Sequence, residues 1–227
     1  MAYFVVMGLG YVGLLLAREA VKVGISVIGV DTNPQVVNTL NAGQSHVCDV
    51  SDADLAEMIA AGFVAVTDRG ALQGAEVVAL CVPTPLDDTG TPDLTAVCRA
   101  SQTVVPHLRR DMLVTLESTI YPGATDEVVR PILEMSGLSA GVDFYLAFSP
   151  ERTDPGNRVF GLRNTPKIVG GHTQRCAKAA ATFYCKLCDQ VVLAKGTREA
   201  EMAKLLENTY RAVNIALVNE LSTVCRR

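Results

Sequence analysis

The chain has 227 residues, which is enough to bury a large core and fits one large domain or two small ones. Apolar residues make up 49% of it, but charge or glycine interrupts each apolar run before membrane-spanning length and no signal pattern opens the sequence, so we predict a cytoplasmic protein with no membrane partner. The net charge is −4, acids and bases are interspersed, and no Lys/Arg stripe or aromatic platform is present, which argues against nucleic acid as a partner.

The N-terminal segment has the order of a dinucleotide-binding unit. An apolar run over Tyr3–Met7 predicts a strand, the sequence GLGYVG at residues 8–13 opens a helical stretch, and a second apolar run over residues 25–30 ends at Asp31. Glycines alone are weak evidence, because tight turns need them whether or not they bind a ligand. Strand, turn, helix, strand and acid in this register together predict a nucleotide site.

Each position of the glycine-rich turn has its own physical role. Gly8 permits the tight turn, Gly10 lets the backbone approach a pyrophosphate, and Gly13 lets the helix sit close to its strand. The first helical turn, at Tyr11 and Val12, offers free N–H groups and partial positive charge to phosphates. We therefore predict that these five residues bind the cofactor.

The acidic residue at the end of the second strand predicts which cofactor binds. Asp31 can accept hydrogen bonds from both ribose hydroxyls, whereas a 2′-phosphate would be repelled unless a cation stood nearby. Residues 32–35 are Thr, Asn, Pro and Gln, so they supply no cation. The sequence therefore predicts NAD rather than NADP.

The chain then alternates between helices and strands. Asn33 is predicted to cap a helix with Pro34 in its first turn. The alternation predicts an α/β fold with a Rossmann-like, doubly wound parallel sheet. Further helices are expected at 51–61, 93–108, 125–135 and 174–187, and further strands at 63–67, 76–82, 112–117, 144–148, 167–169 and 190–193.

The last segment, from Thr197 to the terminus, predicts one long helix. Thr197 can cap it, Glu199 and Glu201 suit the positive end of the helix dipole, and no proline or glycine interrupts it. Glu201, Lys204, Asn208 and Arg211 share one face at steps of three and four residues. A separate apolar stripe contains Met202, Leu205, Leu206, Thr209, Val213, Ala216 and Leu217.

Four polar segments follow predicted strands or lie on the long helix. They are residues 82–85, residues 117–123, residues 149–157, and Lys204 with Asn208. Each has a plain structural interpretation: a rigid proline turn, a helix cap at Ser118 or Thr119, a solvated loop pair, or surface charge. Ligands bind at the carboxyl ends of parallel strands, so we expect the four segments to converge on one polar pocket.

The cysteines and histidines do not predict a metal site. Cys185 and Cys188 have the spacing of a zinc or redox pair, but the sequence contains no second such pair and His172 stands alone. Reduced thiols are the simplest interpretation of seven scattered cysteines, and we predict no metal.

These segments carry a resemblance to a known family. The chain is similar to the N-terminal half of the nucleotide-sugar 6-dehydrogenases, which oxidise UDP-glucose and UDP-N-acetylhexosamines to uronic acids. The matching residues are 8–13, 82–85, 118–123, 149–151 and 204–208 running into 219–220. The forms YPG at 121–123, PER at 150–152 with DPGN at 154–157, and LENTYRAVN at 206–214 most resemble the UDP-N-acetylglucosamine branch.

The resemblance implies a role for several side chains. In the family, a C6 alcohol loses hydride to NAD, a cysteine thiolate attacks the aldehyde, a second hydride leaves a thioester, and water releases the acid. Lys204 and Asn208 would donate to the developing oxyanion, each worth on the order of 3 kcal/mol. Glu151 would be the base for thioester hydrolysis and Thr119 would hold the attacking water. Thr84 and Ser118 would line the cofactor site.

The resemblance also implies an organisation. Residues 1–196 would form the NAD-binding domain and residues 197–227 the start of a central helix that forms a homodimer. The family's UDP-sugar-binding domain, with its cysteine after a glycine-rich loop, has no counterpart among these residues, so we expect NAD binding without complete oxidation. Val36 also stands where relatives often carry Lys or Arg five residues after the ribose acid.

Two other interpretations stay open at this point. The β-hydroxyacid dehydrogenases also join a Rossmann domain to a long helix with Lys and Asn four residues apart, although Glu151 and the turn at 121–123 speak against them. A non-catalytic nucleotide-binding module is the second alternative.

Overall fold

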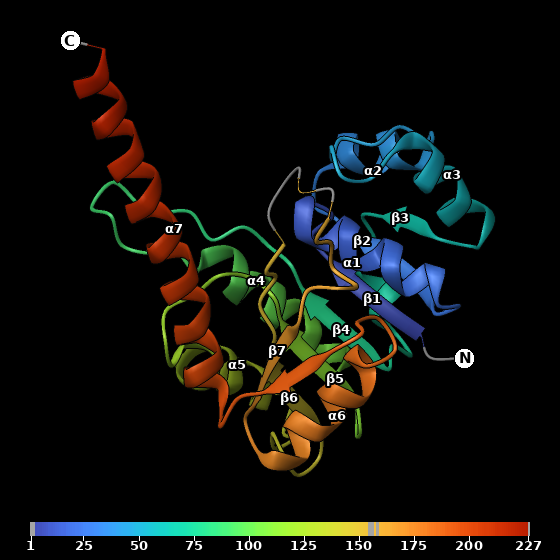
Figure 1. Cartoon of the computed structure of the whole chain (residues 1–227). Coiled ribbons are helices and arrows are strands. Elements are labelled where there is room, and N and C mark those ends of the chain that lie inside the picture. The colour runs from blue at the N-terminus through green and yellow to red at the C-terminus, as the bar shows by residue number, and fades with distance from the viewer. Residues whose placement is uncertain (1–2, 154–156, 158, 227) are drawn as a thin grey trace.

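A twisted sheet with helices on both faces forms the body of the protein (Figure 1). The computed structural model describes residues 3–153, 157 and 159–226. Within these residues the sheet has eight strands in the order β3-β2-β1-β4-β5-β6-β7-β8. The strands are β1 (Tyr3–Met7), β2 (Ser26–Val30), β3 (Val64–Val66), β4 (Val77–Leu80), β5 (Leu113–Leu116), β6 (Tyr145–Phe148), β7 (Lys167–Gly171) and β8 (Val191–Leu193).

The helices form two layers that bury the sheet. One apolar core lies between the sheet and α1, α2, α3 and α6, and the other between the sheet and α4, α5 and the first turn of α7. The predicted doubly wound α/β fold with a long C-terminal helix is therefore confirmed. The helices are α1 (Tyr11–Lys22), α2 (Pro34–Asn41), α3 (Asp52–Ala60), α4 (Thr95–Val104), α5 (Arg130–Glu134), α6 (Gln174–Tyr184) and α7 (Thr197–Cys225), with short 3-10 or π segments η1 (Arg69–Leu72), η2 (Val105–His107) and η3 (Thr125–Val129).

One strand pair departs from the predicted parallel sheet. Strand β7 runs antiparallel to β6, with Phe148 opposite Gly170, whereas the other pairs in the described residues are parallel. A parallel crossover usually needs a helix, and the described residues between β6 and β7 contain none. The chain therefore turns back on itself, and the beginning of β7 lies at the edge where β4, β5 and β6 end.

Two predicted helices are interrupted, in each case at a proline. The helix expected at 93–108 ends at Val104 and continues as the 3-10 turn η2, which contains Pro106. The helix expected at 125–135 begins as the π segment η3 before α5. Pro131 has no N–H to donate within the helix, so regular α-helical bonding cannot run through this position.

Asn33 caps α2 as predicted, and side chains that were not predicted to cap, Ser51 and Thr173, cap α3 and α6, whereas no described side chain caps α7. The Asn33 side chain accepts the N–H of Gln35 at the start of α2, and Ser51 forms a capping box with Asp54 on α3. At α7 the capping position is Gly196, and Thr197 lies inside the helix. Its hydroxyl instead donates to Asp126 at 2.6 Å, because a carboxylate from η3 lies beside the helix start.

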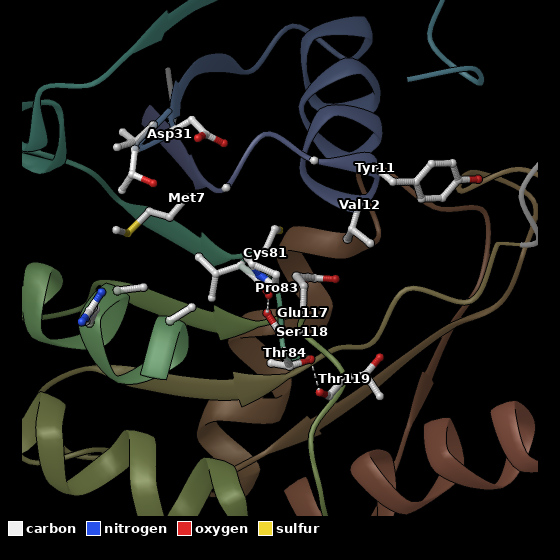
Figure 2. Close-up of a pocket in the computed structure, with 18 of the residues that line it drawn as sticks. Met7, Tyr11, Val12, Asp31, Cys81, Pro83, Thr84, Glu117, Ser118 and Thr119 are labelled. Atoms are coloured by element: carbon white, nitrogen blue, oxygen red, sulfur yellow. Dashed lines mark hydrogen bonds between the residues drawn. The ribbon is translucent and has the colours of Figure 1, made fainter. Parts of the chain in front are cut away.

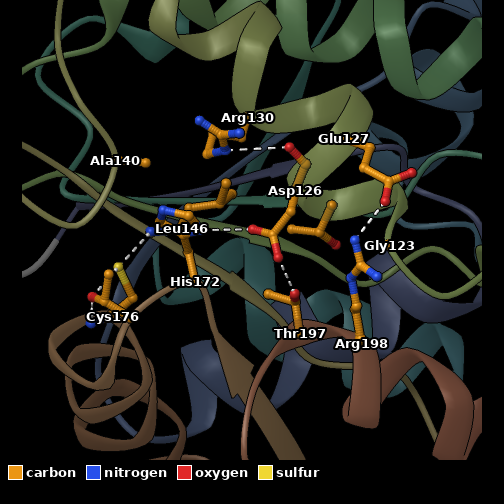
Figure 3. A network of polar contacts seen from close by, with 12 residues as sticks. Gly123, Asp126, Glu127, Arg130, Ala140, Leu146, His172, Cys176, Thr197 and Arg198 are labelled. Carbon is orange, nitrogen blue, oxygen red and sulfur yellow. Dashed lines mark hydrogen bonds and ion pairs between the residues drawn. The ribbon is translucent and has the colours of Figure 1, made fainter.

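A polar network fastens the start of α7 to the body (Figure 3). Asp126 contacts His172 Nδ1 at 2.6 Å through its other oxygen, so it joins the residue that follows β7 to the start of α7. Glu201, predicted to share a face with Lys204, is fully buried instead, and its carboxylate accepts the N–H groups of Gly123 and Thr125. This helix end is thus held by charged hydrogen bonds rather than by apolar contacts alone.

Beyond its second turn α7 leaves the body. Figure 1 shows the C-terminal part of the helix extending away from the sheet. Its large apolar side chains are exposed from Leu206 onward, including Tyr210, Val213 and Leu217. In the part of the chain that the structure describes, no helix is both long and apolar enough to cross a bilayer.

Candidate active site at the carboxyl ends of the strands

A cavity of about 1030 Å³ opens where the central strands end (Figure 2). Residues from all four polar segments line this cavity, as expected from the sequence. From the fourth segment, on α7, Lys204 lines it. Among the predicted site residues, the cavity is lined by Gly8, Gly10, Tyr11, Val12, Asp31, Thr84, Ser118, Thr119, Glu151 and Lys204.

The glycine-rich turn has the geometry that its sequence predicts. Gly8 has φ +92°, and a Cβ there would lie 2.6 Å from the carbonyl oxygen of Cys81, the residue after β4. A Cβ on Gly13 would lie 1.9 Å from the oxygen of Gly8, so Gly13 serves helix packing and does not line the cavity. A Cβ on Gly10 would meet nothing within 4 Å, which leaves open space for a ligand.

The N-terminus of α1 faces this space. Gly10 is its capping residue, and no described side chain caps the helix, so the N–H groups of its first turn are available to an anion. Tyr11 forms one wall of the cavity, and its hydroxyl donates to Asp49 at 2.5 Å. Burial is the first cause that raises the pKa of Tyr11 to about 12, with the contact to Asp49 adding to it.

Asp31 stands at the far side of the cavity from Thr119 (Figure 2). Its two carboxylate oxygens accept the N–H groups of Leu9 and Asn33, both at 2.8 Å, which fixes the side chain beside the glycine-rich turn. Each oxygen keeps capacity for a ribose hydroxyl. Cavity, bare helix end and oriented carboxylate together fit an adenine dinucleotide.

The structure also brings to the cavity two arginines that sequence reasoning missed. Arg69 from η1 and Arg99 from α4 line it together with Val36. Both lie far from Asp31 in sequence and reach the cavity only through the order of the strands. The sole sequence signal was their position just after a predicted strand or in a predicted helix.

Thr84 and Ser118 bind the neighbouring loops together. The Thr84 hydroxyl donates to the carbonyl oxygen of Thr119 at 2.7 Å, and the Ser118 hydroxyl donates to that of Val82 at 2.6 Å. Neither Ser118 nor Thr119 caps the following helical segment, which is preceded by Ala124 without a side-chain cap. The alternative structural interpretation of these two residues is therefore wrong.

Glu151 is buried, with 5% of its surface exposed, and so is not part of a solvated loop pair. Its Oε1 accepts the N–H groups of Arg152 and Thr153, each at 2.7 Å. Its Oε2 has no hydrogen-bond partner among the described residues. A buried carboxylate oxygen without a partner on a cavity wall is able to accept a proton from a ligand or from water.

Lys204 reaches the cavity from α7, but Asn208 does not line it. Burial lowers the pKa of the Lys204 ammonium, while the nearby Glu207 and Glu151 carboxylates oppose that effect. Asn208 lies one turn further along α7 and is exposed. Arg152 pairs with Glu207 at 3.0 Å, which ties the loop that carries Glu151 to the helix that carries Lys204.

The remaining candidates do not form a second site. Residues 154–156 of the DPGN segment lie outside the described residues, and Asn157 accepts the N–H groups of Val159 and Phe160 within its own loop. Cys185 is exposed whereas Cys188 is buried. No group of three potential metal ligands occurs in the described part of the chain.

Comparison with known proteins agrees with this geometry. Residues 2–188 match the UDP-glucose/GDP-mannose dehydrogenase family, NAD binding domain, and residues 198–227 match the central domain of the same family. The chain is 38% identical over 224 residues to UDP-N-acetyl-D-mannosamine dehydrogenase of Pyrococcus horikoshii, covering 98% of this chain and 53% of the relative. It is also 38% identical to UDP-N-acetyl-D-glucosamine 6-dehydrogenase of Salmonella typhi, covering 98% of this chain and 52% of that protein.

Solved structures of nucleotide-sugar dehydrogenases superpose on this chain. The UDP-D-ManNAc dehydrogenase of Pyrococcus horikoshii superposes with a TM-score of 0.90 at 38% identity, over 96% of this chain and 52% of that chain. The UDP-N-acetyl-mannosamine dehydrogenase Cap5O of Staphylococcus aureus does so with 0.89 at 35% identity, over 99% of this chain and 55% of that chain. A 3-hydroxyisobutyrate dehydrogenase of Mycobacterium tuberculosis, 18% identical with a TM-score of 0.68, shares the fold alone.

The chain spans about half the length of the curated relatives it matches. The two family models together nonetheless match residues 2–188 and 198–227, from the glycine-rich turn to the long helix. The chain therefore belongs to the UDP-glucose/GDP-mannose dehydrogenase family, and its residues 2–188 are the NAD-binding domain of that family.

Proposed function

We propose that this chain is the NAD-binding and proton-handling half of a dehydrogenase that oxidises the C6 alcohol of a UDP-sugar to the uronic acid. UDP-N-acetylglucosamine is the favoured substrate, with UDP-N-acetylmannosamine and UDP-glucose as alternatives. One observation carries the proposal: a single cavity is lined by the dinucleotide turn and also by Thr119, Glu151 and Lys204.

In this proposal, one half of the cavity binds and orients NAD. Asp31 accepts the adenosine ribose hydroxyls, the first turn of α1 holds the pyrophosphate, and Thr84 and Ser118 line the nicotinamide end. NAD, when bound, supplies the hydride acceptor for both oxidation steps. These residue roles rest on the positions of the side chains around the cavity.

The other half of the cavity handles protons and negative charge. Lys204 donates to the substrate oxygen as it becomes negative, and Asn208 is the proposed second donor from the next turn of α7. Thr119 holds the attacking water, and Glu151 Oε2 takes its proton. The water oxygen then bonds to the thioester carbon, and the sulfur leaves with the electron pair of the C–S bond.

The proposal includes an organisation of the whole protein. Residues 1–196 form the NAD-binding unit, and residues 197–227 begin a central helix whose apolar side chains pair with those of a second copy. The nucleophilic cysteine and most of the uridine site come from a UDP-sugar-binding domain outside these 227 residues. The support is that the chain covers 53% of its relative and that α7 carries exposed apolar side chains.

The test is an assay of the protein expressed from its complete natural reading frame. With UDP-N-acetylglucosamine, UDP-N-acetylmannosamine or UDP-glucose as substrate, we expect two NADH per uronic acid. In Lys204→Ala, kcat should fall about 100-fold or more, the scale of losing an oxyanion donor, while the Kd for NAD stays unchanged. Oxidation of 3-hydroxyisobutyrate but of no UDP-sugar would refute the proposal, and equal effects of Lys204→Ala on kcat and Kd would assign the lysine a structural role.

A further inference from the structure

A buried charge cluster lies directly behind Glu151. It is centred on Lys167, the first residue of β7, which the antiparallel turn of the chain brings to the edge where the other strands end. Lys167 is 3% exposed, and its Nζ lies 2.6 Å from Oε2 of Glu117, which follows β5 and is fully buried at its side chain. The proposed reaction as described above uses neither residue.

Lys167 also holds the chain just before Glu151. Its ammonium donates to the carbonyl oxygens of Ser149 at 3.2 Å and Pro150 at 3.3 Å. The three N–H groups of the ammonium therefore have acceptors on Glu117, Ser149 and Pro150. The ammonium fixes the backbone from which the Glu151 side chain extends.

Glu117 is held in turn from its other side. The Tyr184 hydroxyl on α6 donates to Glu117 Oε1 and contacts Thr115 Oγ1 at 3.0 Å, and the Tyr184 ring lies 5.1 Å from Lys167 Nζ. Burial alone lowers the pKa of Lys167, but the Glu117 and Glu151 carboxylates outweigh it and raise that pKa. Lys167 therefore stays charged.

The Lys167 ammonium faces two carboxylates, those of Glu117 and Glu151. Lys167 Nζ makes its short contact to Glu117 and stays 3.9 Å from Glu151 Oε2, the oxygen without a hydrogen-bond partner among the described residues. The other titratable groups that face Glu151 are Tyr11 from α1, whose pKa is raised to about 12, Cys81, Cys188 and, from α7, Lys204. Burial raises the pKa of both thiols, so neither competes as an anion.

We infer that Glu117 and Lys167 are a positioning pair for Glu151: Glu117 keeps the Lys167 ammonium from closing on Glu151, so that Oε2 stays free to accept a proton from water. In a site of low dielectric, a direct ion pair would be strong and would occupy the lone pairs that the base must use. The effect of this pair on catalysis rests on the proposed role of Glu151. The geometry of the pair does not depend on that role.

The geometry is tested on the 227-residue chain itself, without turnover. The probe is the ¹⁵Nζ resonance of Lys167, assigned through Lys167→Met, in a mutant cycle of Glu117→Gln and Glu151→Gln. We expect Glu151→Gln to shift this resonance slightly when Glu117 is present and about three times more when Glu117 is replaced, because the ammonium has then moved to Glu151. Equal shifts in both backgrounds would overturn the inference.

The catalytic consequence is tested in the protein from the complete reading frame. Glu117→Gln should lower kcat about tenfold or more while leaving the KM for NAD within about twofold, since the base and not the cofactor site is affected. Thr115→Val is the matched control, because it removes a hydroxyl of the same buried cluster that contacts Tyr184 and leaves the Glu117–Lys167 pair in place, and its kcat should stay close to the parent value. An unchanged kcat in Glu117→Gln would overturn the inference.

A second variant guards against a failure of Glu117→Gln to fold. Glu117→Asp keeps the charge but withdraws the carboxylate from Lys167 by one methylene, and it should give a smaller fall in kcat in the same direction. If the parent protein oxidises no UDP-sugar, the proposed function fails, while the ¹⁵N experiment still decides the geometry of the pair.

Discussion

At the scale of single residues, the site is defined by what each polar atom already contacts. Asp31 is held by two backbone N–H groups, and Thr84 and Ser118 donate to backbone carbonyls. Glu151 uses one oxygen, and its other oxygen has no hydrogen-bond partner among the described residues. Ligand atoms can therefore meet lone pairs that have fixed directions. Such preorganisation lowers the entropy cost of binding.

Replacing Asp31 by Ala should weaken NAD binding. The change removes an ionised acceptor for the ribose hydroxyls, each such hydrogen bond being worth about 1.5 to 3 kcal/mol, so we expect a loss of at least about tenfold. Isothermal calorimetry on the chain measures it. Asp68→Ala is the control, since Asp68 also accepts a backbone N–H after a neighbouring strand but does not line the cavity. An unchanged Kd for Asp31→Ala would refute the assignment.

At the scale of elements, the glycines of the turn before α1 serve two different purposes, the packing of the helix and the binding of a ligand. Gly13 sits where a Cβ would collide with the backbone of Gly8, whereas Gly10 has open space and a φ of −73° that other residues adopt. The same motif thus contains one glycine required by packing and one available to the ligand.

Alanine at these two positions should affect different properties, the stability of the fold and the affinity for NAD. Gly13→Ala should lower the free energy of unfolding by about 2 kcal/mol or more, because overpacking forces the helix from its strand. Gly10→Ala should keep the stability and raise the Kd for NAD, because its methyl group occupies the approach to the pyrophosphate. Urea denaturation and calorimetry on both variants measure this, and a stable Gly13→Ala would contradict the packing role.

The attachment of α7 gives a second prediction for this scale. Glu201→Ala should cost about 3 kcal/mol of stability, because it removes a buried carboxylate that accepts two N–H groups and leaves those donors unpaired. Glu199→Ala, in the same turn but exposed, is the control and should change little. Urea denaturation measures both, and similar values for the two would mean that Glu201 does not anchor the helix.

Elements could be predicted from the sequence where local signals agree, as at β1, at the cap of α2 and along α7. The reversal of β7 could not, because Lys167 to Val169 has the same apolar pattern in either direction. The burial of Glu201 could not be predicted either, since its partners are backbone N–H groups of a turn that is distant in the sequence. The convergence of Thr119, Glu151 and Lys204 followed from the rule for strand ends, but the Glu117–Lys167 pair required the register of β6 and β7.

At the scale of the whole molecule, α7 is the part that the body does not cover. Its large apolar side chains, among them Leu206, Tyr210, Val213 and Leu217, are each more than half exposed. Contiguous exposed apolar surface of this kind is typical of an interface between chains.

We expect the chain to self-associate through α7. Light scattering should give a mass above that of one chain, and Leu217→Glu should reduce it, because a charge would be buried in the apolar interface. Ser222→Glu, on the same helix and exposed, is the control. A monomeric parent chain, or a Leu217→Glu variant of unchanged mass, would contradict this interface.

The proposed function requires NAD to lie in the cavity at the strand ends, and a crystal structure of the chain with NAD tests this most directly. We predict the adenosine ribose on Asp31, the pyrophosphate at the first turn of α1, and the nicotinamide on the side of Thr119 and Lys204. NAD bound elsewhere, or a cavity that stays closed by its own side chains at saturating NAD, would contradict the account.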